Sequence, residues 1–301
     1  MSHDEKLIKA LEKKADEIRK NCFTIFESTQ MGHSGGTMSL IEIITGLYFH
    51  HIKFDPKQCD WPERDRVVLS KAHCCEAIYA ALVELGVYAK DTLKTYYCYG
   101  SPFQGHADRW CTPGIDYSGG SLGQGLSFAA GMAYAEKLKS AVKDINFGQG
   151  GFLQRYIVRL DPLYRCYAIL GDGECQEGMV WEAAMFAAKY KLDNLIAIVD
   201  YNKFSLDGPT NEVMNLEPLI DKWKAFGWWV TEIDGHDIRQ IVDTLDLTTH
   251  LYGDYRPKCI IAHTVKGHGI PAWETEHIHL GRGDVIMRGV KEGRKKYADL
   301  Q

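Results

Sequence analysis

The chain lacks the features of a membrane, secreted or nucleic-acid-binding protein. No apolar run approaches the roughly 20 residues that a membrane helix needs. The first residues carry acids and lysines, without the apolar segment of a signal peptide. A formal net charge of −5 gives no basic footprint for nucleic acid. We therefore expect a cytoplasmic protein with no membrane and no nucleic-acid partner.

The cysteines lack the pattern of a disulfide framework or of a zinc ribbon. There are nine, which is an odd number, and no two of them stand in a C-x-x-C pair. Reduced thiols are the simplest interpretation. Repeats, low-complexity tracts and an obvious linker are also missing, and 45% hydrophobic residues in a chain of 301 can bury a large core. We expect residues 1–301 to form a single domain.

Apolar runs alternate with helical patterns along the chain, which predicts an α/β fold with a parallel sheet flanked by helices. Strands are predicted at 67–69, 167–170, 195–199, 228–233 and 259–262. Helices are predicted at 7–22, 75–85, 126–138, 179–190 and 238–247. The glycine-rich stretch 142–155 is interpreted as an exposed loop.

The most informative segment is 167–204, in which one strand ends in Gly-Asp-Gly and the next is followed by an asparagine. Parallel strands joined by a right-handed crossover end at the same edge of the sheet, so Asp172 and Asn202 should converge. With a backbone carbonyl near Phe204, they suit Mg²⁺, which prefers oxygen ligands and completes its shell with phosphates and water. The segment therefore predicts a site for a metal and a diphosphate.

Three loops that carry histidines precede this segment: MGHSGG with His33, LSKAHCC with His73 and GHAD with His106. A single loop histidine is usually solvated or locally hydrogen-bonded, but three beside glycine turns indicate a ligand site. The glycines at 123–125 fit neither G-x-G-x-x-G nor a P-loop, so nucleotide binding is the weaker interpretation.

In order and spacing, these motifs resemble the transketolase family of thiamine diphosphate enzymes over nearly the whole chain. The matching segments are GHSG at 32–35, LSKAH at 69–73, SGGSLGQG at 118–125, GDG at 171–173 with the later asparagine, and KGHG at 266–269. DGHD at 234–237 is better explained as a turn and a helix cap. The resemblance implies a doubly wound parallel sheet, the thiamine diphosphate-binding fold of the diphosphate-binding (PP) domain.

The resemblance also implies roles for individual residues. Asp172, Asn202 and the carbonyl of Phe204 would bind Mg²⁺, or Ca²⁺ or Mn²⁺ in its place. Thiamine diphosphate would contact Asp172 and Asn202. It would also contact His73, Gly120, Ser121, Leu122, Gly173, Glu177 and His279. His33, His106 and His279 would be catalytic, near the reacting oxygens and the donor hydroxyls.

The late histidine and Glu177 each have an alternative interpretation. The family's Trp-His-Gly is HIHLG at 277–281 here, so His279 is favoured and His277 is the second choice. Glu177 resembles a family glutamate near the subunit interface, but an exposed acid in the first turn of a helix explains it equally well. Ser34, Ala72 and Ser121 replace family residues and are expected to alter loop shape without removing a catalytic group.

The implied function is transfer of a two-carbon ketol unit from a ketose, expected to be phosphorylated, to an aldose through a cofactor-bound carbanion. In the family, a pyrimidine-binding domain supplies the glutamate that activates the cofactor. We expect that domain and the C-terminal domain on a separate subunit. The chain would then be the N-terminal subunit of a split transketolase, an α2β2 heterotetramer that is active only when assembled.

Three other functions remain open at this point. The α subunit of a 2-oxo acid dehydrogenase E1 component also carries GDG and Asn, although the histidine loops and LGQG argue against it. Deoxyxylulose phosphate synthase is a further relative, but it normally keeps both domains on one chain. A noncatalytic regulatory homologue would retain the fold alone.

Overall fold

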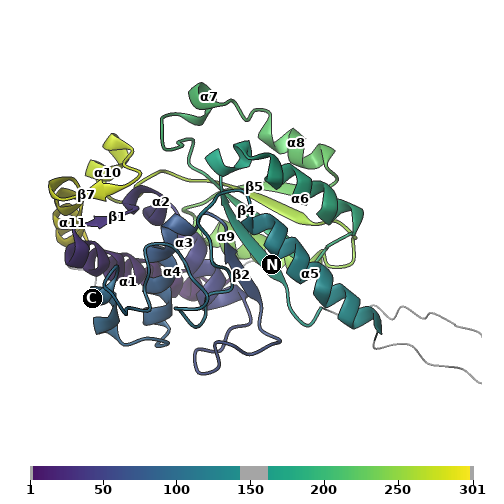
Figure 1. The fold of residues 1–301 in the computed structure, drawn as a ribbon, viewed down its shortest axis with the longest axis horizontal. Coiled ribbons are helices and arrows are strands. Elements are labelled where there is room, and N and C mark those ends of the chain that lie inside the picture. The colour runs from purple at the N-terminus through teal and green to yellow at the C-terminus, as the bar shows by residue number, and fades with distance from the viewer. Residues whose placement is uncertain (1–2, 143–161, 299–301) are drawn as a thin grey trace, which may run out of the picture.

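The sheet is formed by five parallel strands in the order β2-β3-β4-β6-β5 (Figure 1). A computed structural model describes residues 3–142 and 162–298, so nearly all of the predicted loop 142–155 lies outside the described residues. The strands are β2 Arg66–Leu69, β3 Cys166–Gly171, β4 Leu195–Tyr201, β5 Trp229–Asp234 and β6 Lys258–His263. All five predicted strands are confirmed, with ends within two residues.

Helices cover both faces of the sheet, as the doubly wound prediction requires. One face packs against α1 Glu5–Thr29, α3 Ile41–Gly46, α4 Cys75–Glu84 and α9 Ile238–His250, and the other against α5 Gly125–Val142, α6 Gly178–Lys189 and α8 Leu219–Ala225. Neighbouring strand residues alternate between the two cores: Ile169 and Ile198 join the first, whereas Ala168 and Ala197 join the second. Strands buried on both faces are continuously apolar for this reason.

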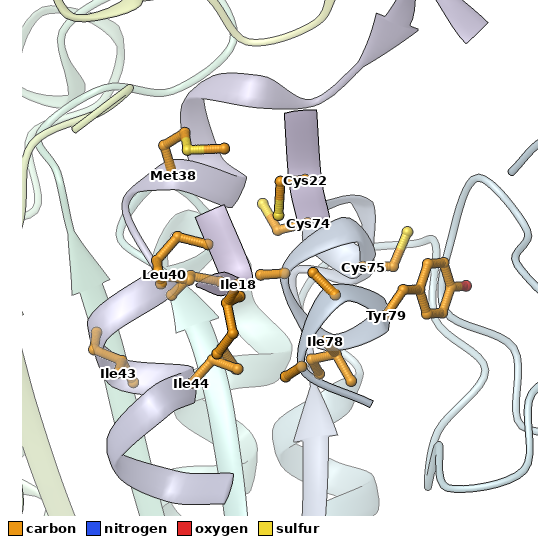
Figure 2. Close-up of a cluster of buried hydrophobic side chains, with 14 of the residues drawn as sticks. Ile18, Cys22, Met38, Leu40, Ile43, Ile44, Cys74, Cys75, Ile78 and Tyr79 are labelled. Atoms are coloured by element: carbon orange, nitrogen blue, oxygen red, sulfur yellow. The ribbon is translucent and has the colours of Figure 1, made fainter. Parts of the chain in front are cut away.

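The first of these cores contains sulfur as well as hydrocarbon. Figure 2 shows Cys22 from α1 and Cys74 beside Met38, with isoleucines of α1, α3 and α4 below them. The two thiols are fully buried and pack as small hydrophobic groups. All nine cysteines lie in the described residues, and all are free thiols there.

A small antiparallel pair joins segments that are far apart in the chain. β1 Met31–Gly32 pairs with β7 Gly281–Arg282, with Met31 opposite Arg282 and Gly32 opposite Gly281. The pair places the loop after β1 next to the segment before β7. Two further helices flank β7, α10 Pro271–Glu276 and α11 Asp284–Lys296, and α11 packs on α1.

Short helical elements complete the described residues: α2 Ser34–Met38, η1 Leu47–His51, η2 Ala72–Cys74, η3 Lys90–Thr95, η4 Gly173–Gln176 and α7 Thr210–Val213. Asp237 caps α9, because its carboxylate accepts hydrogen bonds from the backbone N–H groups of Arg239 (2.9 Å) and Gln240 (3.1 Å). The prediction of a turn and helix cap at 234–237 is therefore confirmed. Within residues 3–142 and 162–298, no helix has both the length and the apolar character needed to cross a membrane.

Candidate active site

A cavity of about 360 Å³ opens at the edge of the sheet where the parallel strands end. Its size lies within the roughly 300–1,000 Å³ of small-molecule sites. The loops after β1, β2, β3, β4 and β6, the loop before α5 and the segment before β7 contribute its walls. The predicted site residues that line it are His33, His73, His106, Gly120, Leu122, Asp172, Gly173, Glu177, Asn202, Phe204 and His279. Among the predicted residues, Ser121 is exposed and does not line the cavity.

Asp172 and Asn202 lie at the ends of adjacent strands, as the crossover rule predicts. Asp172 is 2% exposed, and its carboxylate accepts from the backbone N–H groups of Gly173 (2.7 Å) and Lys203 (2.5 Å). Burial and the neighbouring carboxylate of Asp200 raise the pKa of Asp172 to about 7. The Asn202 amide donates through Nδ2 to Asp200 (3.2 Å), which orients its oxygen, and that oxygen accepts from the N–H of residue 204 (3.1 Å).

A buried ion pair lies beneath these two residues. Lys71 Nζ donates to Asp200 Oδ2, which also accepts from Ser39 Oγ (2.6 Å), and Thr264 Oγ1 donates to Oδ1. Burial alone would raise the pKa of Asp200, but Lys71 and these hydrogen bonds hold it below its usual value. Burial alone would lower the pKa of Lys71, and Asp200 raises it. Both groups therefore stay charged at neutral pH.

A second lysine, Lys266, adds a positive charge to the cavity, and the carboxylates of Asp172 and Asp200 are near enough to affect its pKa. Lys266 is 3% exposed, and its Nζ donates to the carbonyl oxygen of Ser205 (2.9 Å). Burial and the nearby Lys71 lower the pKa of Lys266 to about 8. Among the described residues, no carboxylate lies within ion-pair distance of Lys266. An anion in the cavity would compensate this charge.

Glu174 connects the loops that surround the cavity. One carboxylate oxygen accepts from Ser70 Oγ and from the backbone N–H of Gly123 (2.8 Å), and the other accepts from the N–H of Gly171 (3.0 Å). These partners belong to the loop after β2, the loop before α5 and the end of β3. Burial raises the pKa of Glu174, whereas these hydrogen bonds lower it, and the net change is upward. One buried side chain thus fixes three segments relative to one another.

Four histidines from distant segments meet in the cavity. The ring centroid of His33 lies 5.2 Å from that of His73, 5.7 Å from that of His106 and 5.4 Å from that of His279. Burial, followed by the neighbouring His279, His106 and Lys71, lowers the pKa of His33 to about 3. Burial also lowers the pKa of His106, that of His279 to about 4, and that of His73 well below its usual value. All four rings are therefore neutral at pH 7, and each offers one donor and one acceptor.

The two candidates for the late histidine occupy different places. His279 lines the cavity, and its ring centroid lies 4.9 Å from that of His73. His277 is exposed, has a left-handed backbone (φ 47°) and stacks on the Phe204 ring at 3.8 Å. Glu177 is also exposed and stands at the N-cap position of α6 on the cavity wall, where its side chain makes no capping hydrogen bond.

Glycine at position 35 allows the segment before β7 to approach the loop after β1. A Cβ on Gly35 would lie 1.9 Å from the carbonyl oxygen of Ile278, a distance no side chain can occupy. The backbone N–H of Gly267 also donates to the carbonyl of Gly35 (2.9 Å). This close approach holds His279 near His33.

The donors in the cavity fit a divalent metal and a diphosphate. Asp172 and Asn202 offer oxygen to a metal, as Mg²⁺ prefers. Lys266 supplies a buried positive charge that can face phosphate oxygens. At Gly120 a Cβ would meet no atom within 4 Å, so backbone is exposed to the cavity there.

Sequence reasoning gave no role to Lys71, Asp200, Glu174 or Lys266, although all four line or support the cavity. A signal for the first pair was present: Asp200 and Lys71 each stand at the end of an apolar run, and a buried charge requires a partner. Their pairing could not be read from the chain, because 129 positions separate them.

The similarities to known proteins agree with this site. Residues 11–298 match the family described as "Transketolase, thiamine diphosphate binding domain". The chain is 42% identical to the 6-deoxy-6-sulfo-D-fructose transketolase subunit of Clostridium sp. (strain MSTE9), over 86% of each chain. It is 38% identical to an apulose-4-phosphate transketolase subunit of Actinobacillus succinogenes, over 97% of each chain.

Longer transketolases resemble the chain over part of their length. Human transketolase is 32% identical over 93% of this chain and 41% of its own sequence. The crystal structure of the Campylobacter jejuni transketolase matches with a TM-score of 0.82 at 28% identity, over 97% of this chain and 43% of that one. A Pichia stipitis transketolase mutant matches with a TM-score of 0.82 at 30% identity, over 95% of this chain and 40% of that one. The chain thus spans about two fifths of these solved structures.

Proposed function

Because the chain belongs to the transketolase family and matches its thiamine diphosphate binding domain, we propose that it is the N-terminal subunit of a two-subunit transketolase. The proposed reaction is transfer of a two-carbon ketol unit from a ketose to an aldose. The observation that carries this proposal is one cavity that joins an oxygen-donor pair for a metal, a buried lysine for phosphate and four neutral histidines for a sugar. The α subunit of a 2-oxo acid dehydrogenase is the less favoured alternative.

The oxygen-donor pair would hold the anionic end of the cofactor. Asp172 and Asn202 would bind Mg²⁺ together with the backbone carbonyl of Phe204, and Lys266 would face the diphosphate. When bound, thiamine diphosphate supplies the carbon nucleophile that carbon–carbon cleavage of a ketose needs. The metal-binding roles rest on the oxygen donors and on the fixed orientation of the Asn202 amide.

The histidines would manage protons and hydroxyl groups of the sugar. A neutral imidazole can donate through one nitrogen and accept through the other, so His33 and His279 can exchange protons with substrate oxygens near pH 7. His33 Nδ1 is buried 4.0 Å from Glu76 Oε1, and the His33 side chain lines the cavity. His106 is exposed at the mouth of the cavity, where it can accept a hydrogen bond from a hydroxyl group of the donor ketose.

We further propose that residues 1–301 form one diphosphate-binding domain and that a second polypeptide completes the enzyme. Relatives named as transketolase subunits match this chain over 86–97% of their own length, which supports the same division of labour. The partner would supply the glutamate that activates the cofactor ring and the groups that recognise the far end of the sugar. An α2β2 assembly is the expected stoichiometry.

The test compares the chain alone with the chain plus its C-terminal partner, in an assay of two-carbon transfer with added thiamine diphosphate and Mg²⁺. Activity is expected only in the mixture, and full activity of the chain alone would refute the partner requirement. In the mixture, Asp172→Ala should abolish cofactor-dependent activity. Asp221→Asn on α8 is the matched control and should behave as wild type. Wild-type activity of the Asp172→Ala complex would favour a noncatalytic role, and turnover of a 2-oxo acid would favour the dehydrogenase alternative.

A further inference from the structure

A second group of ligand-type side chains lies away from the cavity. His3 precedes α1, His50 stands in η1, and Asp246 belongs to α9. His51, next to this group, lines a small hollow together with Asp65 and Arg165. Asp65 directly precedes β2, and Arg165 directly precedes β3. The group is therefore near the edge of the sheet where the strands begin, opposite the candidate active site.

The distances within this group suit a tetrahedral ion. One nitrogen of each histidine and one oxygen of Asp246 all lie within 4.8 Å of one another. His3 Nε2 is 3.0 Å and His50 Nε2 is 3.1 Å from Asp246 Oδ2, and His3 Nε2 is 3.6 Å from Asp243 Oδ1. With metal–ligand bonds of about 2.0–2.1 Å, neighbouring ligands of a tetrahedral zinc ion are roughly 3.3 Å apart.

Hydrogen bonding does not account for all of these close approaches. His3 Nε2 and Asp243 Oδ1 are both buried, and neither has a hydrogen-bond partner. His3 Nε2 thus lies 3.0 Å from a carboxylate oxygen without the direction that a hydrogen bond requires. Leaving such atoms unpaired costs free energy, and a cation between them would satisfy both.

Asp246 is held in place by a further histidine. His51 Nδ1 lies 2.8 Å from Asp246 Oδ1, the oxygen that faces away from His3 and His50. A hydrogen bond to the second oxygen of a metal-binding carboxylate fixes its orientation, which is a common arrangement around zinc. The His51 side chain is 5% exposed, so this support is itself rigidly packed.

The other group of this kind among the described residues is Glu42, His236 and His268, and it does not suit a metal. Both nitrogens of His236 are engaged, one with Glu42 Oε2 (3.0 Å) and the other accepting from the N–H of Val265 (2.8 Å). Arg19 already neutralises Glu42. The polar atoms of Glu42 and His236 therefore already have partners, whereas His3 Nε2 and the neighbouring Asp243 Oδ1 have none.

We propose that His3, His50 and Asp246 form a zinc site that fastens the segment before α1 to α9. Two imidazole nitrogens and one carboxylate oxygen are a ligand set that zinc accepts, with water or Asp243 in the fourth position. The site is structural in effect, since it links the first described residues to a helix near the end of the chain. It does not depend on the function proposed above.

The test uses the full chain after removal of metal with EDTA, titrated with ZnCl2 and, separately, with MgCl2. Zinc should raise the Tm of wild type by roughly 4 °C at a hundredfold excess over its Kd, and magnesium should not reproduce this rise. His3→Gln should bind one equivalent of zinc fewer and lose the rise. Because His3 precedes α1, this variant should fold normally.

The matched control is His250→Gln, one turn beyond Asp246 on α9 and outside the group. It should keep the zinc stoichiometry and the rise in Tm. The zinc equivalent that His3→Gln loses should show nitrogen and oxygen ligands by X-ray absorption, which excludes binding to cysteines. The loss in His3→Gln itself excludes binding to the active-site histidines. Equal zinc binding and equal Tm shifts in wild type and His3→Gln would overturn the proposal.

Discussion

At the scale of single residues, the candidate site depends on charges that are kept or removed by their surroundings. The cavity holds one fully buried ion pair, Lys71 and Asp200, whose members stay charged because each stabilises the other. In the same cavity, burial is the main cause that lowers the pKa of His33 to about 3 and that of His279 to about 4. A buried group thus stays charged when an opposite charge lies beside it, and becomes neutral when none does.

The two late histidines should differ sharply in function. In the reconstituted complex, His279→Ala is expected to lower kcat by roughly 10²–10⁴-fold, the usual loss for a group that transfers protons. His277→Ala should leave kcat near its wild-type value, because that ring stacks on Phe204 outside the cavity. Steady-state kinetics with a ketose donor gives both numbers. Equal losses in the two variants would contradict this assignment.

Residue-scale prediction succeeded where a residue type stands at the end of a predicted strand. The crossover rule alone predicts that Asp172 and Asn202 converge, and both line the cavity. Glu76 could not be found in this way. It lies inside the apolar helix α4, and its partners are the N–H of His33 (2.9 Å), Thr37 (2.8 Å) and Tyr96 (2.9 Å), from three other segments. Only the folded chain brings those donors to one carboxylate.

At the scale of elements, periodicity was sufficient for the sheet and its main helices. The predicted helix at 179–190 is α6 Gly178–Lys189, and that at 75–85 is α4 Cys75–Glu84. The pair β1 and β7 was not predicted, because strands of two residues have no periodicity to detect. The pair is nevertheless the element that brings the late histidine to the cavity.

Substitution at Gly35 tests how tightly this pair is packed. Gly35→Ala should lower the free energy of unfolding by roughly 1–3 kcal/mol, because its Cβ would overlap the carbonyl oxygen of Ile278. Gly131→Ala in α5 is the matched control. A Cβ there meets no atom within 4 Å, so a gain of about 0.5–1 kcal/mol is expected from helix propensity. Urea unfolding of both variants measures the difference, and an unchanged Gly35→Ala would show that the segment can move aside.

At the scale of the whole molecule, a buried network joins segments from both ends of the chain. Arg19 of α1 pairs with Glu42 of α3, and Glu42 also bonds to His236 after β5 (3.0 Å). Burial alone would raise the pKa of Glu42, but Arg19 and then His236 lower it to about 2, from an ordinary value of 4.5. Breaking such a pair leaves an uncompensated buried charge.

This network predicts how stability depends on acid. A carboxylate whose pKa is lowered by folding contributes stability that is fully present above about pH 4.5 and is lost as the pH falls toward 2. The difference in unfolding free energy between wild type and Glu42→Gln should therefore shrink by on the order of 3 kcal/mol over that interval. Urea unfolding between pH 7 and pH 2.5 tests this.

Glu84→Gln provides the control for the acid experiment. Its ion pair with Lys14 is partly exposed, at 19% and 42% for the two side chains, and surface pairs contribute about 0–1 kcal/mol. The difference between this variant and wild type should hardly change with pH. A difference for Glu42→Gln that stays constant down to pH 2.5 would show that Arg19 does not hold the carboxylate ionised.

The pairing of β1 with β7 also fixes when the cavity can be completed during protein synthesis. β1 is translated first, and its partner Gly281–Arg282 follows about 250 residues later. At about 5–20 residues per second, His33 waits more than ten seconds for the segment that carries His279. A nascent chain can therefore form its five-stranded sheet before it can close the sugar-facing wall, which has to wait until the segment with His279 and β7 has been translated.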